Sequence, residues 1–419
     1  MPSTTRPFAR RLALVLVTAL VGSSILVLTV GYVGRSRLAD DRQAFEQDVA
    51  SLDNTTRLRE EPSPDDNAVS WFRRAAVADE STPAMIARRS ELLAVPDWSS
   101  EQLAEARSLV EPASAALDLA ARAVTASDSS FGLDPRAGFD TIPDDLLSFL
   151  RLRESLALRG RVALADGELV GALAATDALY RLRTTLRAEP LVVFQLLGFG
   201  VDWAHLDLVQ RLLLDPRLDT DALDRLEHQL AADETRPVAE ALATEAAHIV
   251  DVMLKADDDT RGLGRWARHV LNPWDQRAML HVYRQLAMAG DEPIEDVAGF
   301  AGAGRPWSPV AWVSADILIP NLAELPLRYR ASESCRQLAR WALAARRHAL
   351  EQTRYPETLQ RIASQPPIDP YSGESPTYSL ADGAPQVASP RAEALWADRH
   401  PRRDTPFAPR FTWRLPTID

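Results

Sequence analysis

The chain has 419 residues, 46% of them hydrophobic and 25% charged, and this composition excludes an intrinsically disordered protein. Its length predicts two or three domains. A formal net charge of −12 without a compensating basic stripe argues against a nucleic-acid partner, because such binding depends on Lys and Arg neutralising phosphates.

The first predicted element is an uncharged run of 23 residues from Leu12 to Gly34, which follows Arg6, Arg10 and Arg11. A helix needs ~20 apolar residues to cross a bilayer. The alternative is a cleaved signal peptide, whose apolar stretch is usually about 7–15 residues long and ends in a small-x-small site. The run has no such site and no neighbouring cysteine. We therefore favour an uncleaved anchor over a signal peptide or a lipoprotein signal.

The flanking charges predict the orientation of this anchor. The charged residues that precede the run are all basic. On its far side, Arg35 and Arg37 are mixed with Asp40 and Asp41. By the positive-inside rule, residues 1–11 form a cytoplasmic tail and residues 12–34 span the bacterial cytoplasmic (inner) membrane. The bulk of the chain is then periplasmic. Later apolar stretches are too short or carry charges, so we expect a single span.

Residues 35–330 are predicted to form a helical extracytoplasmic domain. Thr82 followed by Pro83 is a helix N-cap with proline at the first helical position. Ser99 and Gln102 predict a capping box that opens a helix reaching about Ala126. Another helix is expected to begin at residue 143. Little of this region shows the alternation of β-branched residues that indicates strands.

The clearest local unit runs from Leu146 to Arg187. Two helices of about 20 residues are expected to meet at Ala165–Glu168, with small residues where the pair approaches closely. A second pair is predicted over 192–214 and 221–232. These pairs resemble the hairpins of tetratricopeptide solenoids, but they do not fit a 34-residue period. We therefore favour an irregular α-helical hairpin array over a regular repeat.

The last part, residues 331–419, is predicted to be a small α+β module, which makes the chain mainly α overall. A helix is expected from Arg336 to Leu350. Strands are expected over Thr377–Leu380 and Gln386–Ser389, which flank a hairpin signal. In Phe411–Leu415 the apolar residues alternate with polar ones, which indicates a half-buried strand.

Short motifs in this tail carry a family resemblance. They are Arg354-Tyr-Pro-Glu-Thr-Leu359, Ile368-Asp-Pro-Tyr-Ser-Gly373 with Tyr378, and Trp413-Arg-Leu-Pro416. The tail resembles the periplasmic part of type II secretion pseudopilins. It is more closely similar to the C-terminal module of uncharacterised single-span bacterial membrane proteins that end in such a strand. The resemblance covers about 85 residues, by the positions of these motifs. It implies a helix packed on a small antiparallel sheet.

Two departures limit what this resemblance implies. Leu12–Gly34 lacks the Glu that follows the pseudopilin cleavage site. Ala388–Trp396 stands where major pseudopilins have an acidic, calcium-holding loop. Neither pilus assembly nor calcium binding therefore carries over, and no cofactor is expected.

A weak metal-binding pattern occurs once on a predicted helix. Glu245, His248 and Asp251 lie on neighbouring turns, but a di-iron carboxylate site needs a second Glu-x-x-His pair that the chain lacks. Polar residues at such spacing are routine on solvated helix faces, and we favour that interpretation. Two further pairs have ligand-like spacing: Asp202 with His205, and Asp224 with His228.

Four tryptophans, Trp266, Trp274, Trp307 and Trp312, fall close together around a Gly/Pro-rich break. Packing in the core is the favoured interpretation, and an interaction surface is the alternative, because aromatic residues are enriched at interface centres. The single cysteine, Cys335, cannot form an internal disulfide and is expected to be buried.

Two hypotheses about function remain open. The favoured one is a membrane-anchored periplasmic protein with a non-enzymatic scaffold or interaction role, whose helical hairpins bind an unidentified envelope protein. The alternative is an envelope enzyme with a metal or acid/base site around Glu245, His248 and Asp251. The chain shows no G-x-S-x-G, H-E-x-x-H or phosphate-loop motif.

Overall fold

A computed structural model of the protein describes residues 32–33, 36–44, 47, 62–133, 143–231, 238, 240–242, 244, 277, 280, 309–362, 368–381, 384–400 and 407–417. For residues 309–323 the description covers the backbone alone. Apart from Tyr32 and Val33, the predicted anchor at residues 12–34 lies outside the described residues. The single-pass prediction therefore remains a prediction.

The described chain is mainly helical and carries a small three-stranded sheet, as expected at this coarse level. In chain order its elements are α2 (Ala68–Ala78), α3 (Pro83–Ala94), α4 (Ser100–Val110), η1 (Glu111–Ala113), α5 (Ser114–Thr125), α6 (Ser148–Ala165), α7 (Leu169–Arg187), α8 (Val192–Leu213), α9 (Thr220–Ala231), α13 (Pro309–Gln352), η3 (Leu359–Arg361), β1 (Thr377–Ala381), β2 (Ala384–Ala388), α14 (Pro390–Arg399) and β3 (Thr412–Arg414).

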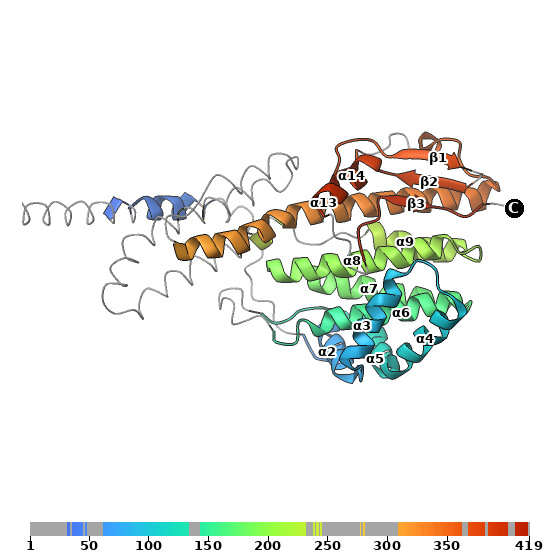
Figure 1. The fold of residues 1–419 in the computed structure, drawn as a ribbon, viewed down its shortest axis with the longest axis horizontal. Helices are drawn as coiled ribbons and strands as arrows, with labels where there is room; N and C mark the ends of the chain where they lie inside the picture. The colour runs from blue at the N-terminus through green and yellow to red at the C-terminus, as the bar shows by residue number, and fades with distance from the viewer. Residues whose placement is uncertain are drawn as a thin grey trace, which may run out of the picture.

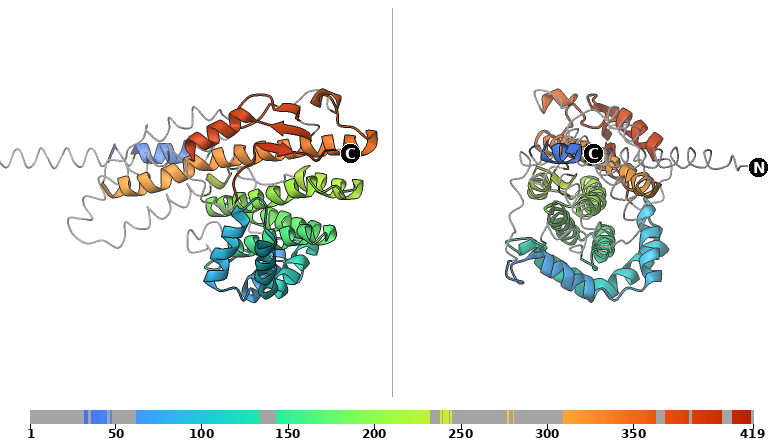
Figure 2. Two further views of the ribbon diagram at one scale, coloured as in Figure 1. Left: turned by 45° about the vertical axis from the view of Figure 1, so that its right-hand side comes forward. Right: turned by 90° about the vertical axis from the view of Figure 1, so that its left-hand side faces the viewer.

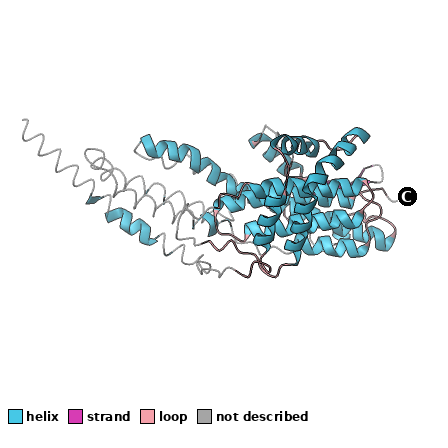
Figure 3. Ribbon diagram, turned by 90° about the horizontal axis from the view of Figure 1, so that it is seen from below, coloured by secondary structure: helices cyan, strands magenta, loops and turns pink. Residues whose placement is uncertain are grey.

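These elements stack in layers along the long helix α13. The sheet and α14 lie on one side of α13, and α8 and α9 lie on the other, with α7 and α6 beyond them (Figure 1). An end-on view places helices α2–α5 as an outer layer that curves around α6 and α7 (Figure 2). Seen from below, the described chain is drawn almost wholly as helix (Figure 3).

The predicted hairpin of 146–187 is present as α6 and α7. A Schellman motif ends α6: the Glu168 N–H donates to Ala163 O at 2.7 Å, and the Gly167 N–H donates to Leu164 O at 3.1 Å. Gly167 has a φ of +81°, a left-handed conformation that favours glycine. The second predicted pair is present as α8 and α9. The sequence therefore predicted both turns and the lengths of these four helices well.

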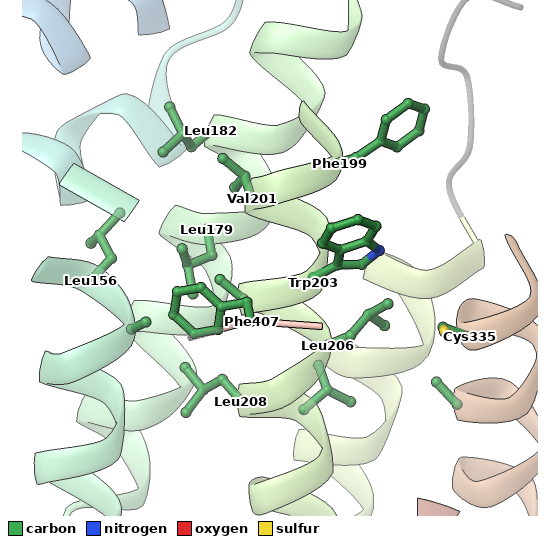
Figure 4. Packing of buried hydrophobic residues seen from close by; sticks show 14 of the residues in the cluster. Leu156, Leu179, Leu182, Phe199, Val201, Trp203, Leu206, Leu208, Cys335 and Phe407 are labelled. Carbon is green, nitrogen blue, oxygen red and sulfur yellow. The ribbon is translucent and has the colours of Figure 1, made fainter. Parts of the chain in front are cut away.

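Helix α8 is the centre of the core. Figure 4 shows Trp203 and Leu206 on the side of α8 that faces Cys335 of α13, while Val201 points to the other side, toward Leu182 of α7. Close packing with α6 depends on Gly160, because a Cβ there would lie 2.4 Å from a methyl group of Leu208.

Among the described helices, α8 alone is long and apolar enough to cross a membrane, but 72% of its most apolar window is buried inside the protein. Burial on all sides explains that apolar character, so α8 is a core helix in this structure.

The sequence predicted two helix starts correctly and two other helix boundaries wrongly. Thr82 caps α3 with Pro83 at its first position, and Ser99 and Gln102 form both bonds of the capping box of α4. The helix predicted to continue to Ala126 is instead broken at η1, because Pro112 has no N–H to extend the helical ladder. The predicted start at residue 143 is a turn, and α6 begins at Ser148.

The C-terminal sheet is antiparallel in the order β1-β2-β3, with Tyr378 opposite Val387 and Val387 opposite Trp413. The three predicted strands are confirmed to within two residues at each end. Helix α14 was not predicted, although Pro390 at its first turn is a helix-start signal. The predicted domain boundary at 330/331 falls inside α13.

The C-terminal module packs directly against the helical region. Trp396 of α14 makes an edge-to-face contact with Trp203 of α8 at 5.5 Å between ring centroids. In the Asp-Pro turn, Asp369 accepts bonds from the Tyr371 and Ser372 amides and from the Ser334 hydroxyl of α13. A local turn motif is thereby tied to the long helix.

Candidate functional site

A groove lies where the helical region meets the C-terminal module. Two adjoining hollows of about 580 and 560 Å³ make it up, and they share Pro96, Asp97, Arg211 and Leu214. Five arginines line the two hollows, against four acidic residues. We call this feature the arginine groove. Its five arginines are Arg161, Arg211, Arg217, Arg410 and Arg414.

Arg161 forms the wall nearest the α3–α4 loop. It donates to the carbonyl oxygens of Leu93 at 2.9 Å and Val95 at 2.7 Å, which α3 leaves unpaired at its C-terminal end. Its guanidinium carbon lies 4.2 Å from the centre of the Trp98 ring. Burial and the neighbouring Arg211 lower the pKa of Arg161 to about 9, so it remains a cation at neutral pH. Arg161 is therefore a structural residue that also adds positive charge to the groove.

Asp207 of α8 forms the floor of the groove. Its two carboxylate oxygens accept bonds from Arg211, at 2.9 Å, and from Arg410. Burial by itself would raise the pKa of Asp207, but Arg410 and Arg211 outweigh burial and hold the pKa below its ordinary value. One carboxylate thus sits among three guanidinium groups, since Arg161 is also close enough to act on it. The floor keeps an excess of positive charge.

Strand β3 forms the opposite wall. It is an edge strand of the described sheet, and the bonds from Leu415 N to Pro385 O and from Ser389 N to Phe411 O turn residues 411 and 415 toward β2. By alternation, the backbone of Arg414 faces outward. Its carbonyl accepts a bond from Gln210 of α8 at 2.7 Å. Gln210 therefore occupies one of the outward-facing acceptors of this edge, which leaves one group fewer for uncontrolled pairing.

The Arg414 side chain gives the groove an exposed cation. This side chain is exposed, and no hydrogen bond or ion pair joins its guanidinium to another described residue. The Arg410 side chain is 40% exposed and holds Asp207. Both can therefore reach a bound anion, because guanidinium groups bind carboxylates and phosphates bidentately.

Most residues predicted as sites lie outside the described part of the chain. This holds for Glu245, His248 and Asp251, and for Trp266, Trp274 and Trp307. Trp312 falls on α13, but its side chain is also outside the description. The structure therefore does not test the predicted metal site or the predicted interaction surface of tryptophans, and both remain predictions.

The pair Asp202 and His205 is described, and it has a structural environment. Asp202 is fully buried; Arg183 of α7 donates to one of its oxygens at 3.2 Å and the Ser332 hydroxyl of α13 donates to the other. His205 Nε2 bonds Gln229 Oε1 of α9 at 2.8 Å. Because Gln229 can only accept through that oxygen, His205 carries its proton on Nε2. The two residues therefore join α7, α8, α9 and α13, and they do not form a metal site.

The pair Asp224 and His228 lies exposed on α9, and Asp224 pairs with Arg347 of α13. Within the described residues there is no group of three or more side chains placed to hold a metal ion. Cys335 is buried as predicted, and burial raises the pKa of its thiol well above the ordinary value.

Sequence reasoning missed the arginine groove. Its residues come from the α3–α4 loop, from α6, from α8 and from the C-terminal segment, which are far apart in the chain. Many arginines of this chain bond carbonyl oxygens or carboxylates elsewhere. The presence of an arginine in the sequence therefore does not predict a groove residue. Only the fold brings these five together.

Comparison of the chain with protein-family models, with curated proteins and with solved structures gives no match.

Proposed function

We propose that this is a membrane-anchored periplasmic protein with a non-enzymatic role, which binds an acidic segment of another cell-envelope protein in the arginine groove. The observation that carries this proposal is the cluster around Asp207, where Arg161, Arg211 and Arg410 act on one carboxylate and leave an excess of arginine over acid in the groove lining. The chain carries −12 overall, so such a local excess of arginine is selective for an anionic partner.

The lining also suits a polypeptide. Half-buried Trp98 contributes aromatic surface beside the arginines, and the nearly buried Phe407 and Phe411 line the hollow behind it; aromatic and Arg residues are enriched at interface centres. Guanidinium groups recognise the carboxylates of Asp and Glu bidentately. An acidic peptide with apolar residues therefore fits both kinds of surface.

The position in the envelope rests on the uncharged run at 12–34 and on the charges around it. The pseudopilin-like interpretation of the tail has the support of its arrangement, a three-stranded antiparallel sheet beside the long helix α13. We propose no pilus assembly role, because the residues on which that role depends are missing from the sequence.

The test is site-specific photo-crosslinking in native membranes with the full chain. A photoreactive residue replaces Arg414 in one variant and Val77 of α2, which is 88% exposed and outside the groove lining, in the control. We expect one discrete crosslinked partner from position 414 and not from position 77. Adding Arg410→Glu to the position-414 variant should abolish that crosslink. Adding Arg122→Glu, on α5, to the same variant should leave the crosslink intact.

Two outcomes would contradict the proposal. One is the absence of any discrete product from position 414. The other is a product that survives Arg410→Glu, because the groove charge would then have no part in binding.

A further inference from the structure

The least expected side chain in the described core is that of Arg187, in the last turn of α7. The residue has no exposed surface, and none of its three guanidinium nitrogens has a hydrogen-bond partner. A guanidinium carries five N–H donors and a full charge. Leaving such a group buried without an acceptor costs several kcal/mol.

The neighbours of Arg187 explain only part of its position. Its guanidinium carbon lies 5.0 Å from the centre of the Phe199 ring of α8 and 5.4 Å from that of Tyr329 of α13. Aromatic rings attract a cation through their faces. They do not supply lone pairs for the N–H groups, which point outward in the plane of the guanidinium. Those donors therefore still need an acceptor.

The buried carboxylate of Asp202 lies close enough to act on Arg187 but is bonded by other residues. Arg183 and Ser332 each bond one of its oxygens. Arg187 is close enough to contribute to the lowered pKa of Asp202, after Arg183 and Arg336, but it makes no bond to it. In the described part of the chain, none of the three guanidinium nitrogens of Arg187 makes a hydrogen bond.

The sequence of α8 makes room for this side chain. A Cβ at Gly198 would lie 2.4 Å from the Cγ atom of Arg187 and 3.2 Å from its Cδ atom. Glycine inside a helix costs about 1 kcal/mol relative to alanine. Gly198 therefore lowers the helix stability of α8 slightly, but it leaves space for the Arg187 side chain between α7, α8 and α13.

We propose that Arg187 holds a small inorganic anion, of the size of chloride, in the plane of its guanidinium group at the junction of α7, α8 and α13. The anion supplies both the missing acceptor and the missing negative charge. The absence of any exposed surface at Arg187 favours a monatomic ion over a carboxylate-bearing or phosphate-bearing ligand. Because Phe199 and Tyr329 contact the same guanidinium, the anion stabilises the packing of α13 on α7 and α8.

The test measures thermal unfolding of the detergent-solubilised full chain by tryptophan fluorescence, with sodium chloride replacing sodium gluconate at constant ionic strength. A ligand that binds only the folded state raises the unfolding midpoint in a saturable way. We expect a rise of roughly 3 °C at saturating chloride. In Arg187→Met this rise should be lost, whereas Arg74→Met, an exposed arginine of α2, should keep it.

A midpoint that does not depend on chloride in the unaltered chain would overturn the proposal. So would an Arg187→Met variant that keeps the full chloride response. Should Arg187→Met fail to fold, Gly198→Ala takes its place, because the added methyl group displaces the Arg187 stem. The chloride concentration for half of the effect must then rise, and an unchanged value would also overturn the proposal.

Discussion

Two carboxylates five residues apart on α8 show how the same ion-pair chemistry has different consequences in different places. Asp202 and Asp207 are each held by arginines, and the arginines hold the pKa of each below its ordinary value. Asp202 lies wholly inside the α7–α8–α13 junction, with 0% exposure for both it and Arg183. Asp207 lies at the floor of the groove, where Arg211 and Arg410 are 21% and 40% exposed.

The two sites differ in whether water can hydrate an arginine after its ion pair with aspartate is broken. At the junction, a guanidinium that loses its carboxylate stays desolvated. In the groove, it can rehydrate or take another anion. The first place therefore stabilises the fold, and the second is available for binding.

The largest expected effect is that of Asp202→Asn. This nearly isosteric change removes the buried negative charge on which Arg183, Arg336 and Arg187 act, and we expect a loss of about 3–5 kcal/mol in the free energy of unfolding. Asp207→Asn should cost only about 1–2 kcal/mol, because its arginines reach solvent. Chemical denaturation of both variants gives the comparison. Equal losses would show that the two sites do not differ in solvent access as the structure indicates.

The pH dependence of stability sharpens the comparison further. Burial lowers the pKa of His205 to about 4, from an ordinary value of 6.5. Between these values the unfolded chain binds a proton that the folded chain does not, so the free energy of unfolding falls as the pH falls from 6.5 toward 4. The full effect is about 3 kcal/mol. Asp202 and Asp207 contribute in a separate window, below their ordinary value of 3.8.

We therefore expect His205→Gln to flatten the stability profile between pH 6.5 and 4, because glutamine does not titrate. His228→Gln, at an exposed position of α9, is the matched control and should leave the profile unchanged. Urea denaturation at several pH values measures this. A profile that keeps its slope in His205→Gln would contradict a buried neutral imidazole.

The smallest expected effect separates two glycines of α8. Gly198→Ala forces the Arg187 stem to move and should cost about 1–3 kcal/mol. At Gly200 the nearest atom to an added Cβ is at the guanidinium end of the long Arg153 side chain, at 3.0 Å, and not on a stem that is fixed to the backbone. Gly200→Ala should therefore be neutral, or stabilising by up to about 1 kcal/mol, because alanine favours a helix. Thermal unfolding measures both variants, and equal midpoints would show that Gly198 makes no room for Arg187.

Local signals account for the part of the fold that the sequence predicted well. The capping box at Ser99 and the turn at Gly167 each depend on residues within one or two helical turns. The strands around residues 377–388 follow from alternation and a hairpin signal. The sequence failed where a nearby proline had two possible roles: Pro112 interrupts a helix, whereas Pro390 begins one.

The sites were predicted less well, for a different reason. Asp202 and His205 have ligand-like spacing on one helix, but spacing does not reveal that Arg183 and Gln229 of other helices already occupy them. The arginine groove had no sequence signal, because its arginines do not differ locally from those that bond helix ends elsewhere.

The sequence by itself determined that the described chain is mainly helical, where the α6–α7 hairpin turns and where a small sheet follows. These features depend on backbone preferences and periodicity, which act over a few residues. Only the tertiary structure decided that Asp202 is fully buried at the α7–α8–α13 junction and that Asp207 lies in the arginine groove. It also decided that Arg187 is buried between three helices. Charge pairing and loss of solvent depend on segments up to two hundred residues apart, as in the contact of Gln210 with Arg414, and no local pattern encodes them.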